Sequence, residues 1–217
     1  MKIATNSVNG TLLMPGEEFS YNKAIGKTTP ENGYQQAGAY VAGEVVQEYG
    51  GGVCNISTIL YRAAMRANLK SSLRYNHSMM VSYAEPSLDA TVYEGEIDYR
   101  FVNTYDFPIY IEGYMTSNTI VFNIYGNKES FGNNTYELVN EVIEKLDYTT
   151  EYVNDNTLAE GSRVTTVNGM AGYRSKAYLV TYSNGVEVSR EFISSDYYAP
   201  MNTVVKVGTK KATTTEN

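Results

Sequence analysis

The sequence predicts an α+β protein in two parts. The N-terminal domain is expected to hold an antiparallel sheet and one main helix, and the C-terminal domain to be small and all-β. Three observations support this: one run of apolar residues at helical spacing, many short runs that alternate apolar and polar residues, and a polar, glycine-containing stretch between the two parts. The predicted boundaries are 1–127 for the first domain, 128–135 for the linker, 136–209 for the β domain and 210–217 for a polar tail.

The main helix is expected shortly after a glycine-rich segment. Residues 11–20 predict a turn and a short strand, residues 27–38 are rich in turn formers, and residues 38–49 predict a strand or a hairpin. The spacing then predicts a helix over 55–68, without Gly or Pro inside. Its apolar positions are Ile56, Ile59, Leu60, Ala63, Ala64 and Ala67.

The rest of the chain predicts strands. Residues 71–83 alternate, which puts His77 on the same face as Leu73 and Tyr75 and predicts that it faces the core. Other strand candidates lie at 90–95, 97–103, 107–115 and 119–126, and beyond the linker at 136–155, 162–169, 174–185, 186–200 and 202–209.

Composition excludes several classes of function. The 217 residues carry a formal net charge of -7, and an acidic surface argues against binding to nucleic acid. No basic amphipathic helix, membrane-spanning run or signal peptide is evident. The opening residues are typical of a start inside a longer gene product, so we expect any export signal or membrane anchor upstream.

The chain has one cysteine, Cys54, and one histidine, His77. A lone cysteine forms no intramolecular disulfide, but together with histidine it is a pattern typical of a thiol nucleophile. A helix over 55–68 runs about 20 Å away from Cys54, and an antiparallel strand from residue 71 needs about six residues to return. His77 is therefore expected level with the thiol, whose pKa the helix N-terminus would lower.

Groups that could support such a pair lie nearby. Backbone amides around Gly51, Gly52 and Val53 are candidates for an oxyanion hole. Asp89 is the preferred residue to orient the imidazole and Glu85 the next, although a backbone carbonyl or Tyr83 would serve equally well.

Other interpretations remain open. A lone cysteine is often a small buried apolar residue, a lone histidine is often a hydrogen-bonded core residue, and three glycines can simply form a tight turn. No metal site is expected, because zinc would need two more ligands and the chain has no further Cys or His. No cofactor is expected either.

Three motifs carry a resemblance to a known family. They are P-G-x-x-F-S at 15–20, G-G-G-V-C-x-x-S-T-x-L-Y at 50–61 and H-S-x-x-V-S-Y at 77–83. Residues 3–127 thereby resemble the VanW domain, although Asn55 stands where this family usually has Gln. Residues 136–209 resemble the five-glycine (G5) domain of bacterial surface proteins, on "LAEGSRVTTVNGMAGYRSKAYLVTYSNGVEV" and "VVKVGT".

The resemblance implies a peptidoglycan L,D-transpeptidase of Gram-positive bacteria that works outside the membrane and forms 3→3 cross-links through a thioester. It implies Cys54 as the nucleophile and His77 as its partner. Asn55, Ser57 and Tyr83 are candidates for contacts with the substrate. The implied partners are peptidoglycan stem peptides, as tetrapeptide donor and amine acceptor, and wall glycan for the second domain. The alternatives are a cysteine peptidase or carboxypeptidase that acts on wall stem peptides, and a non-catalytic wall-binding module.

Overall fold

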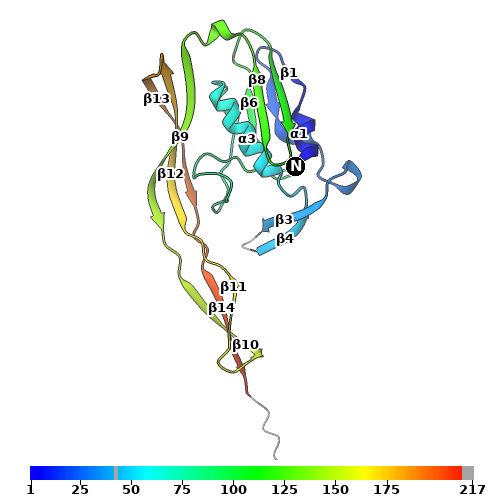
Figure 1. Cartoon of the computed structure of the whole chain (residues 1–217), viewed down its shortest axis with the longest axis vertical. Helices are drawn as coiled ribbons and strands as arrows, with labels where there is room; N and C mark the ends of the chain where they lie inside the picture. Colours follow the sequence, from blue (N-terminus) through cyan, green and yellow to red (C-terminus); the bar gives the residue numbers. More distant parts are fainter. Residues whose placement is uncertain (42–43, 212–217) are drawn as a thin grey trace, which may run out of the picture.

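The computed structural model describes residues 1–41 and 44–211. The fold is α+β: helices and short strands form the N-terminal part, and long strands form an extended C-terminal part (Figure 1). Among the described residues, no helix is both long enough and apolar enough to cross a membrane.

The N-terminal part contains two small three-stranded antiparallel sheets and a hairpin. The sheets have the orders β1-β7-β8 and β2-β6-β5, and β3 pairs with β4. The helices are α1 (Lys2–Val8), α2 (Tyr21–Ile25), the 3-10 helix η1 (Pro30–Asn32) and α3 (Val53–Arg66). The strands are β1 (Thr11–Leu13), β2 (Glu18–Ser20), β3 (Gln36–Val41), β4 (Glu44–Tyr49), β5 (Ser71–Leu73), β6 (Arg100–Val102), β7 (Ile109–Met115) and β8 (Ile120–Tyr125).

The C-terminal part is built from two three-stranded sheets. One is the antiparallel sheet β13-β12-β9, and in the other, β10-β14-β11, strands β10 and β14 run parallel. Its elements are the 3-10 helix η2 (Lys128–Ser130), β9 (Asn134–Leu146), β10 (Thr150–Ala159), β11 (Arg163–Val167), β12 (Gly172–Ser183), β13 (Val186–Tyr198) and β14 (Thr203–Lys210). Strands β9, β12 and β13 are close to the N-terminal part, and β10, β11 and β14 extend away from it (Figure 1).

One hydrophobic core joins the two parts. Helix α3 lies between β8 and β9 in Figure 1 and contacts both. Its buried Ile56 and Leu60 belong to the same cluster as Leu138 of β9 and Leu179 of β12. The β13-β12-β9 sheet therefore covers part of the N-terminal core.

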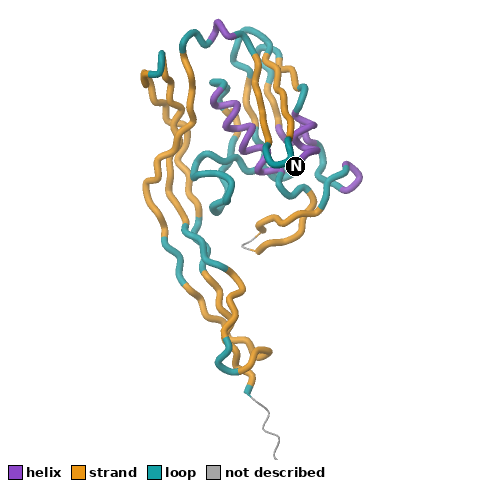
Figure 2. Tube along the Cα trace, viewed as in Figure 1, coloured by secondary structure: helices purple, strands orange, loops and turns teal. Residues whose placement is uncertain are grey.

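The predicted strand over 71–83 is wrong beyond its first residues. Strand β5 ends at Leu73, and no helix or strand forms between β5 and β6 (Figure 2). The alternating apolar residues do not form a buried face, since Tyr75 is 49% and Tyr83 37% exposed. This stretch is instead held by polar contacts, among them the hydrogen bond from the His77 amide to the Asp89 carboxylate at 2.8 Å.

Other predictions differ in detail. The main helix begins at Val53 and ends at Arg66, so Cys54 lies inside its first turn. The strand candidates at 90–95 and 97–103 reduce to β6 and isolated bridges, and 136–155 divides into β9 and β10. Helices α1 and α2 were not predicted, because each is too short to show a helical period.

Candidate active site

The position of Cys54 depends on the turn between β4 and α3. Gly52 precedes the helix in the left-handed region at φ 91°, which glycine adopts without strain. A side chain at Gly51 would overlap Ala37 of β3. The glycines thus allow the turn that places Cys54 at the start of the helix, where unpaired amides and the helix dipole favour an anion.

The thiol contacts the segment that follows Asp89. Cys54 Sγ lies 3.3 Å from the carbonyl oxygen of Val92, to which it donates, and 3.7 Å from Thr91 Oγ1. Ser57 secures this segment, since its buried hydroxyl donates to the carbonyl of Ala90 at 2.6 Å. The contacts of Ser57 in this structure are to backbone carbonyls, and its predicted contact with a substrate stays a prediction.

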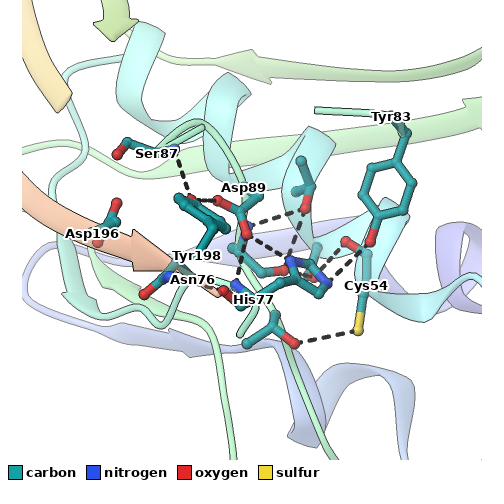
Figure 3. Close-up of polar contacts among 12 residues, drawn as sticks. Cys54, Asn76, His77, Tyr83, Ser87, Asp89, Asp196 and Tyr198 are labelled. Carbon is teal, nitrogen blue, oxygen red and sulfur yellow. Dashed lines mark hydrogen bonds and ion pairs between the residues drawn. The ribbon is translucent and has the colours of Figure 1, made fainter. Parts of the chain in front are cut away.

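His77 is held at both ring nitrogens. Its Nδ1 lies 2.6 Å from Asp89 Oδ2, and its Nε2 lies 3.1 Å from the hydroxyl of Tyr83 (Figure 3). Because a carboxylate only accepts, Nδ1 carries a proton. Nε2 is therefore the ring nitrogen available for proton transfer. In this structure its hydrogen-bond partner is the Tyr83 hydroxyl.

Asp89 is almost completely buried, at 1% exposure, and its two oxygens accept four hydrogen bonds, of which Figure 3 shows those from His77 and Tyr198. Oδ2 accepts from the amide and the Nδ1 of His77, and Oδ1 accepts from Arg74 Nη2 at 3.0 Å and from the Tyr198 hydroxyl at 2.5 Å. Glu85, the alternative considered from the sequence, is exposed. The structure therefore brings Asp89, and not Glu85, to the imidazole.

The pKa shifts of Asp89, His77 and Cys54 favour an ion pair between His77 and Cys54. Burial raises the pKa of Asp89, but the hydrogen bond from His77 and the charge of Arg74 outweigh burial and lower it. Burial lowers the pKa of His77, but Asp89 and Cys54 raise it to about 9. Burial raises the pKa of the Cys54 thiol, but attraction to His77 brings it below its ordinary value. Both shifts favour a thiolate beside an imidazolium.

The thiol and the imidazole are not directly hydrogen-bonded in this structure. Within the described part of the chain, the polar contacts of Sγ are to Thr91 and Val92, and that of Nε2 is to Tyr83.

The candidate oxyanion amides differ in availability. The Val53 amide donates to the carbonyl of Gly50 at 3.1 Å, so it is occupied. Over the described residues, the amides of Gly51, Gly52 and Cys54 make no hydrogen bond. Asn55 is half-buried, and its side chain makes no hydrogen bond to a described residue. These three amides and the Asn55 side chain have donors to offer a substrate.

Three residues of the site were not found from the sequence: Arg74, Asp196 and Tyr198. Arg74 lies 15 residues before Asp89, and Tyr198 lies 109 residues after it in the C-terminal part. No spacing rule connects residues so far apart.

A cavity of about 850 Å³ lies elsewhere, between α3, β8 and the start of β9. It is lined by Ile59, Arg62, Ala63, Arg66, Ala67, residues 120–125, Phe131 and residues 134–136. None of the residues around the thiol borders it, so it is separate from the site.

Comparison with known proteins identifies the N-terminal part. The family model described as "VanW like protein" matches residues 1–125, more than half of the chain. The chain belongs to the VanW family. The motif around Cys54 and the loop that carries His77 and Asp89 both lie within the VanW match, and residues 137–210 match the G5 domain.

Two curated relatives share the VanW region. The uncharacterized protein YoaR of Bacillus subtilis is 34% identical over 127 residues, which are 58% of this chain and 42% of YoaR. The vancomycin B-type resistance protein VanW of Enterococcus faecalis is 26% identical over 135 residues, which are 59% of this chain and 49% of that protein. The chain thus spans less than half the length of each relative.

A solved structure, "IgA1 Protease G5 domain structure", is similar to 38% of the chain and is covered over 99% of its own length. Its sequence identity is 31% and its TM-score 0.26.

Proposed function

We propose that this VanW-family chain is a cysteine-dependent peptidoglycan L,D-transpeptidase that forms 3→3 cross-links outside the membrane. The observation that carries the proposal is the arrangement of Cys54 in the first turn of α3, beside an imidazole whose other nitrogen is held by buried Asp89. A nucleophile, a proton carrier and a group that orients the carrier are the parts that acyl transfer requires.

The first half-reaction forms a thioester. The Cys54 thiolate attacks the carbonyl carbon of the third residue of a tetrapeptide stem, forming the S–C bond. The C–N bond to the terminal D-Ala then breaks, and His77 gives its proton to the leaving amine. Free amides of the Gly51–Cys54 turn are suited to stabilise the oxyanion.

The second half-reaction forms the cross-link. The side-chain amine of another stem attacks the thioester carbon, and His77 accepts a proton from this amine. The S–C bond breaks, and Cys54 returns to the thiolate. Water at the same position would give a free carboxylate, so the outcome depends on whether the amine or water reaches the thioester.

We also propose that the G5 region binds wall glycan. The match to the G5 domain supports this, as do aromatic side chains exposed on its strands and loops, which can stack on sugar rings. These side chains are Tyr148, Tyr152, Phe192 and Tyr197.

The test is to incubate the chain with tetrapeptide-stem muropeptides and to analyse the products by mass spectrometry. We expect a cross-linked dimer that has lost one D-Ala, and no reaction with Cys54→Ala or His77→Ala. Tyr114→Phe, a change at an exposed position of β7 outside the site, serves as the control and should react like the wild type.

Other products would contradict the proposal in distinct ways. Loss of D-Ala without a dimer would indicate a carboxypeptidase, and cleavage elsewhere in the stem would indicate a peptidase. No reaction by a folded chain, together with an unreactive thiol, would favour a wall-binding module.

A further inference from the structure

We infer that the C-terminal β part supplies two positioning residues, Tyr198 and Asp196, that hold Asp89 and thereby His77, so that the active arrangement is shared by both parts of the chain. The inference deepens the proposed function and rests on it wherever cross-linking is concerned. Its structural claim concerns the state of His77 and is testable without a substrate.

Tyr198 acts on Asp89 directly. It is the last residue of β13, is fully buried, and donates its hydroxyl proton to Asp89 Oδ1 at 2.5 Å (Figure 3). The same hydroxyl accepts from the amide of Ser87 at 2.7 Å. Ser87 has a positive φ of 67°, which is strained for a residue other than glycine and needs such support. One side chain of β13 thus fixes both the turn before Asp89 and its carboxylate.

Asp196 acts through Arg74. The Arg74 guanidinium donates to Asp89 Oδ1 at 3.0 Å and to Asp196 Oδ2 at 2.7 Å, and all three side chains are buried. Ser194 donates to the same oxygen of Asp196 at 3.0 Å. Arg74 is therefore held between a carboxylate of the N-terminal part and one of the C-terminal part.

The charges explain why Asp196 matters for His77. Asp89 and Asp196 are negative, and Arg74 and a protonated His77 are positive, so the four groups together are neutral. Arg74 is shared between the two carboxylates, so loss of the Asp196 charge would leave Arg74 to pair with Asp89 alone and would weaken the hold of Asp89 on the imidazolium. The other titratable groups around these four are Cys54, Tyr61, Tyr83 and Tyr198.

Strand β13 also holds the backbone on both sides of His77. The Asn76 side chain donates to the carbonyl of Tyr197 at 2.9 Å, and the amide of Ala199 donates to the carbonyl of Ser78 at 2.8 Å. The loop between β5 and β6 lacks regular structure, so these contacts with the end of β13 define where the imidazole lies.

The test uses the full chain and the NMR titration of His77, whose ring signal is unambiguous because the chain has one histidine. We expect Asp196→Asn to reduce the proton affinity of His77 about tenfold, since a buried opposite charge is lost. Asp196→Glu, which keeps the charge, should restore it. Glu191→Gln removes a charge from the same strand at an exposed position paired with Lys70, and should titrate like the wild type.

Tyr198→Phe is the second variant and decides the matter if Asp196→Asn fails to fold. We expect its cross-linking rate to fall about tenfold with little change in KM, because a hydrogen bond to a charged group is lost. Tyr114→Phe, at an exposed position of β7, is the control. If the wild type does not cross-link at all, the proposed function fails. Tyr198→Phe is then tested by the rate at which iodoacetamide alkylates Cys54. This alkylation rate should also fall in the variant.

Two results would overturn the inference. One is a folded Asp196→Asn chain in which His77 titrates as in the wild type. The other is a folded Tyr198→Phe chain that loses stability but keeps the wild-type rates of cross-linking and alkylation, since that would give Tyr198 a merely structural role.

Discussion

The carboxylate of Asp89 governs the chemistry that the neighbouring side chains can perform. Four donors on its two oxygens keep it ionised despite nearly complete burial. An ionised Asp89 fixes the proton of His77 on Nδ1 and favours the imidazolium. The imidazolium in turn favours the thiolate of Cys54. Asp89 therefore influences the reactivity of the thiol through His77.

The pH dependence expected of the proposed cross-linking reaction follows from these pKa shifts. The reactive pair needs a deprotonated Cys54, whose pKa is lowered, and a protonated His77, whose pKa is raised to about 9. Activity should therefore rise as the thiol ionises and fall as pH passes about 9, where His77 loses the proton that the leaving amine requires. The measurement is kcat/KM across pH.

Alkylation of Cys54 by iodoacetamide provides the control, because it needs the thiolate and no proton donor. Its rate should stay high where cross-linking falls. Cross-linking that keeps rising in parallel with alkylation through the alkaline range would contradict a role for His77 as the acid.

Among the structural elements, the turn into α3 has the most direct effect on Cys54, the proposed nucleophile. Gly52 ends the turn with a φ of 91°, and the helix that follows packs its apolar face against the core through Ile56 and Leu60. The turn and the packed face together determine the direction in which Cys54 points.

Gly52→Ala tests this turn. A side chain in the left-handed region costs about 1–2 kcal/mol, and the new Cβ would also press on the Met1 side chain, so the free energy of unfolding should fall by at least that amount. Alkylation of Cys54 should slow as well, because the first turn of α3 must reorient. Denaturant titration and the iodoacetamide rate measure the two effects.

Gly95→Ala is the matched control, since Gly95 has a similar φ of 79° in an exposed turn with open space around it. It should lose comparable stability and keep the wild-type thiol reactivity. Equal losses of reactivity in both variants would show that the turn at Gly52 has no special influence on Cys54.

The elements differ in how far the sequence could predict them. The helix of 14 residues was predicted to within two residues at each end, because its apolar face has a clear period. The loop that carries His77 was mistaken for a strand, since its side chains alternate by chance while its backbone bonds to Asp89 and to β13. The estimate that placed His77 level with Cys54 assumed a strand from residue 71, and in the structure that strand ends at Leu73.

At the scale of the whole molecule, the two parts share their core. Leu138, Ala177 and Leu179 of the β13-β12-β9 sheet belong to the cluster formed around α3. Parts that share a core are expected to unfold together, in contrast to domains joined only by a linker. The α+β prediction described each part correctly and gave no indication of this union, because it depends on contacts between distant residues.

Leu179→Ala tests the shared core. Leu179 is 2% exposed, and its truncation should lower the free energy of unfolding by about 3 kcal/mol. Amide hydrogen exchange should show that α3 and β12 lose protection together. Val188→Ala on β13, at a position 59% exposed, should change stability by less than about 0.5 kcal/mol. Faster exchange in β12 with unchanged protection of α3 would mean that the parts unfold independently.

The hydrogen bond between Tyr198 and Asp89 also determines how early in folding the surroundings of Asp89 can be completed. It joins residues 109 positions apart, so it cannot form until residue 198 has been synthesised. Contacts of such long separation form late in folding, because closing the intervening loop costs entropy. A nascent or partly folded chain therefore carries the thiol before it carries the full set of donors to Asp89, and the proposed nucleophile gains its complete surroundings only when β13 has docked.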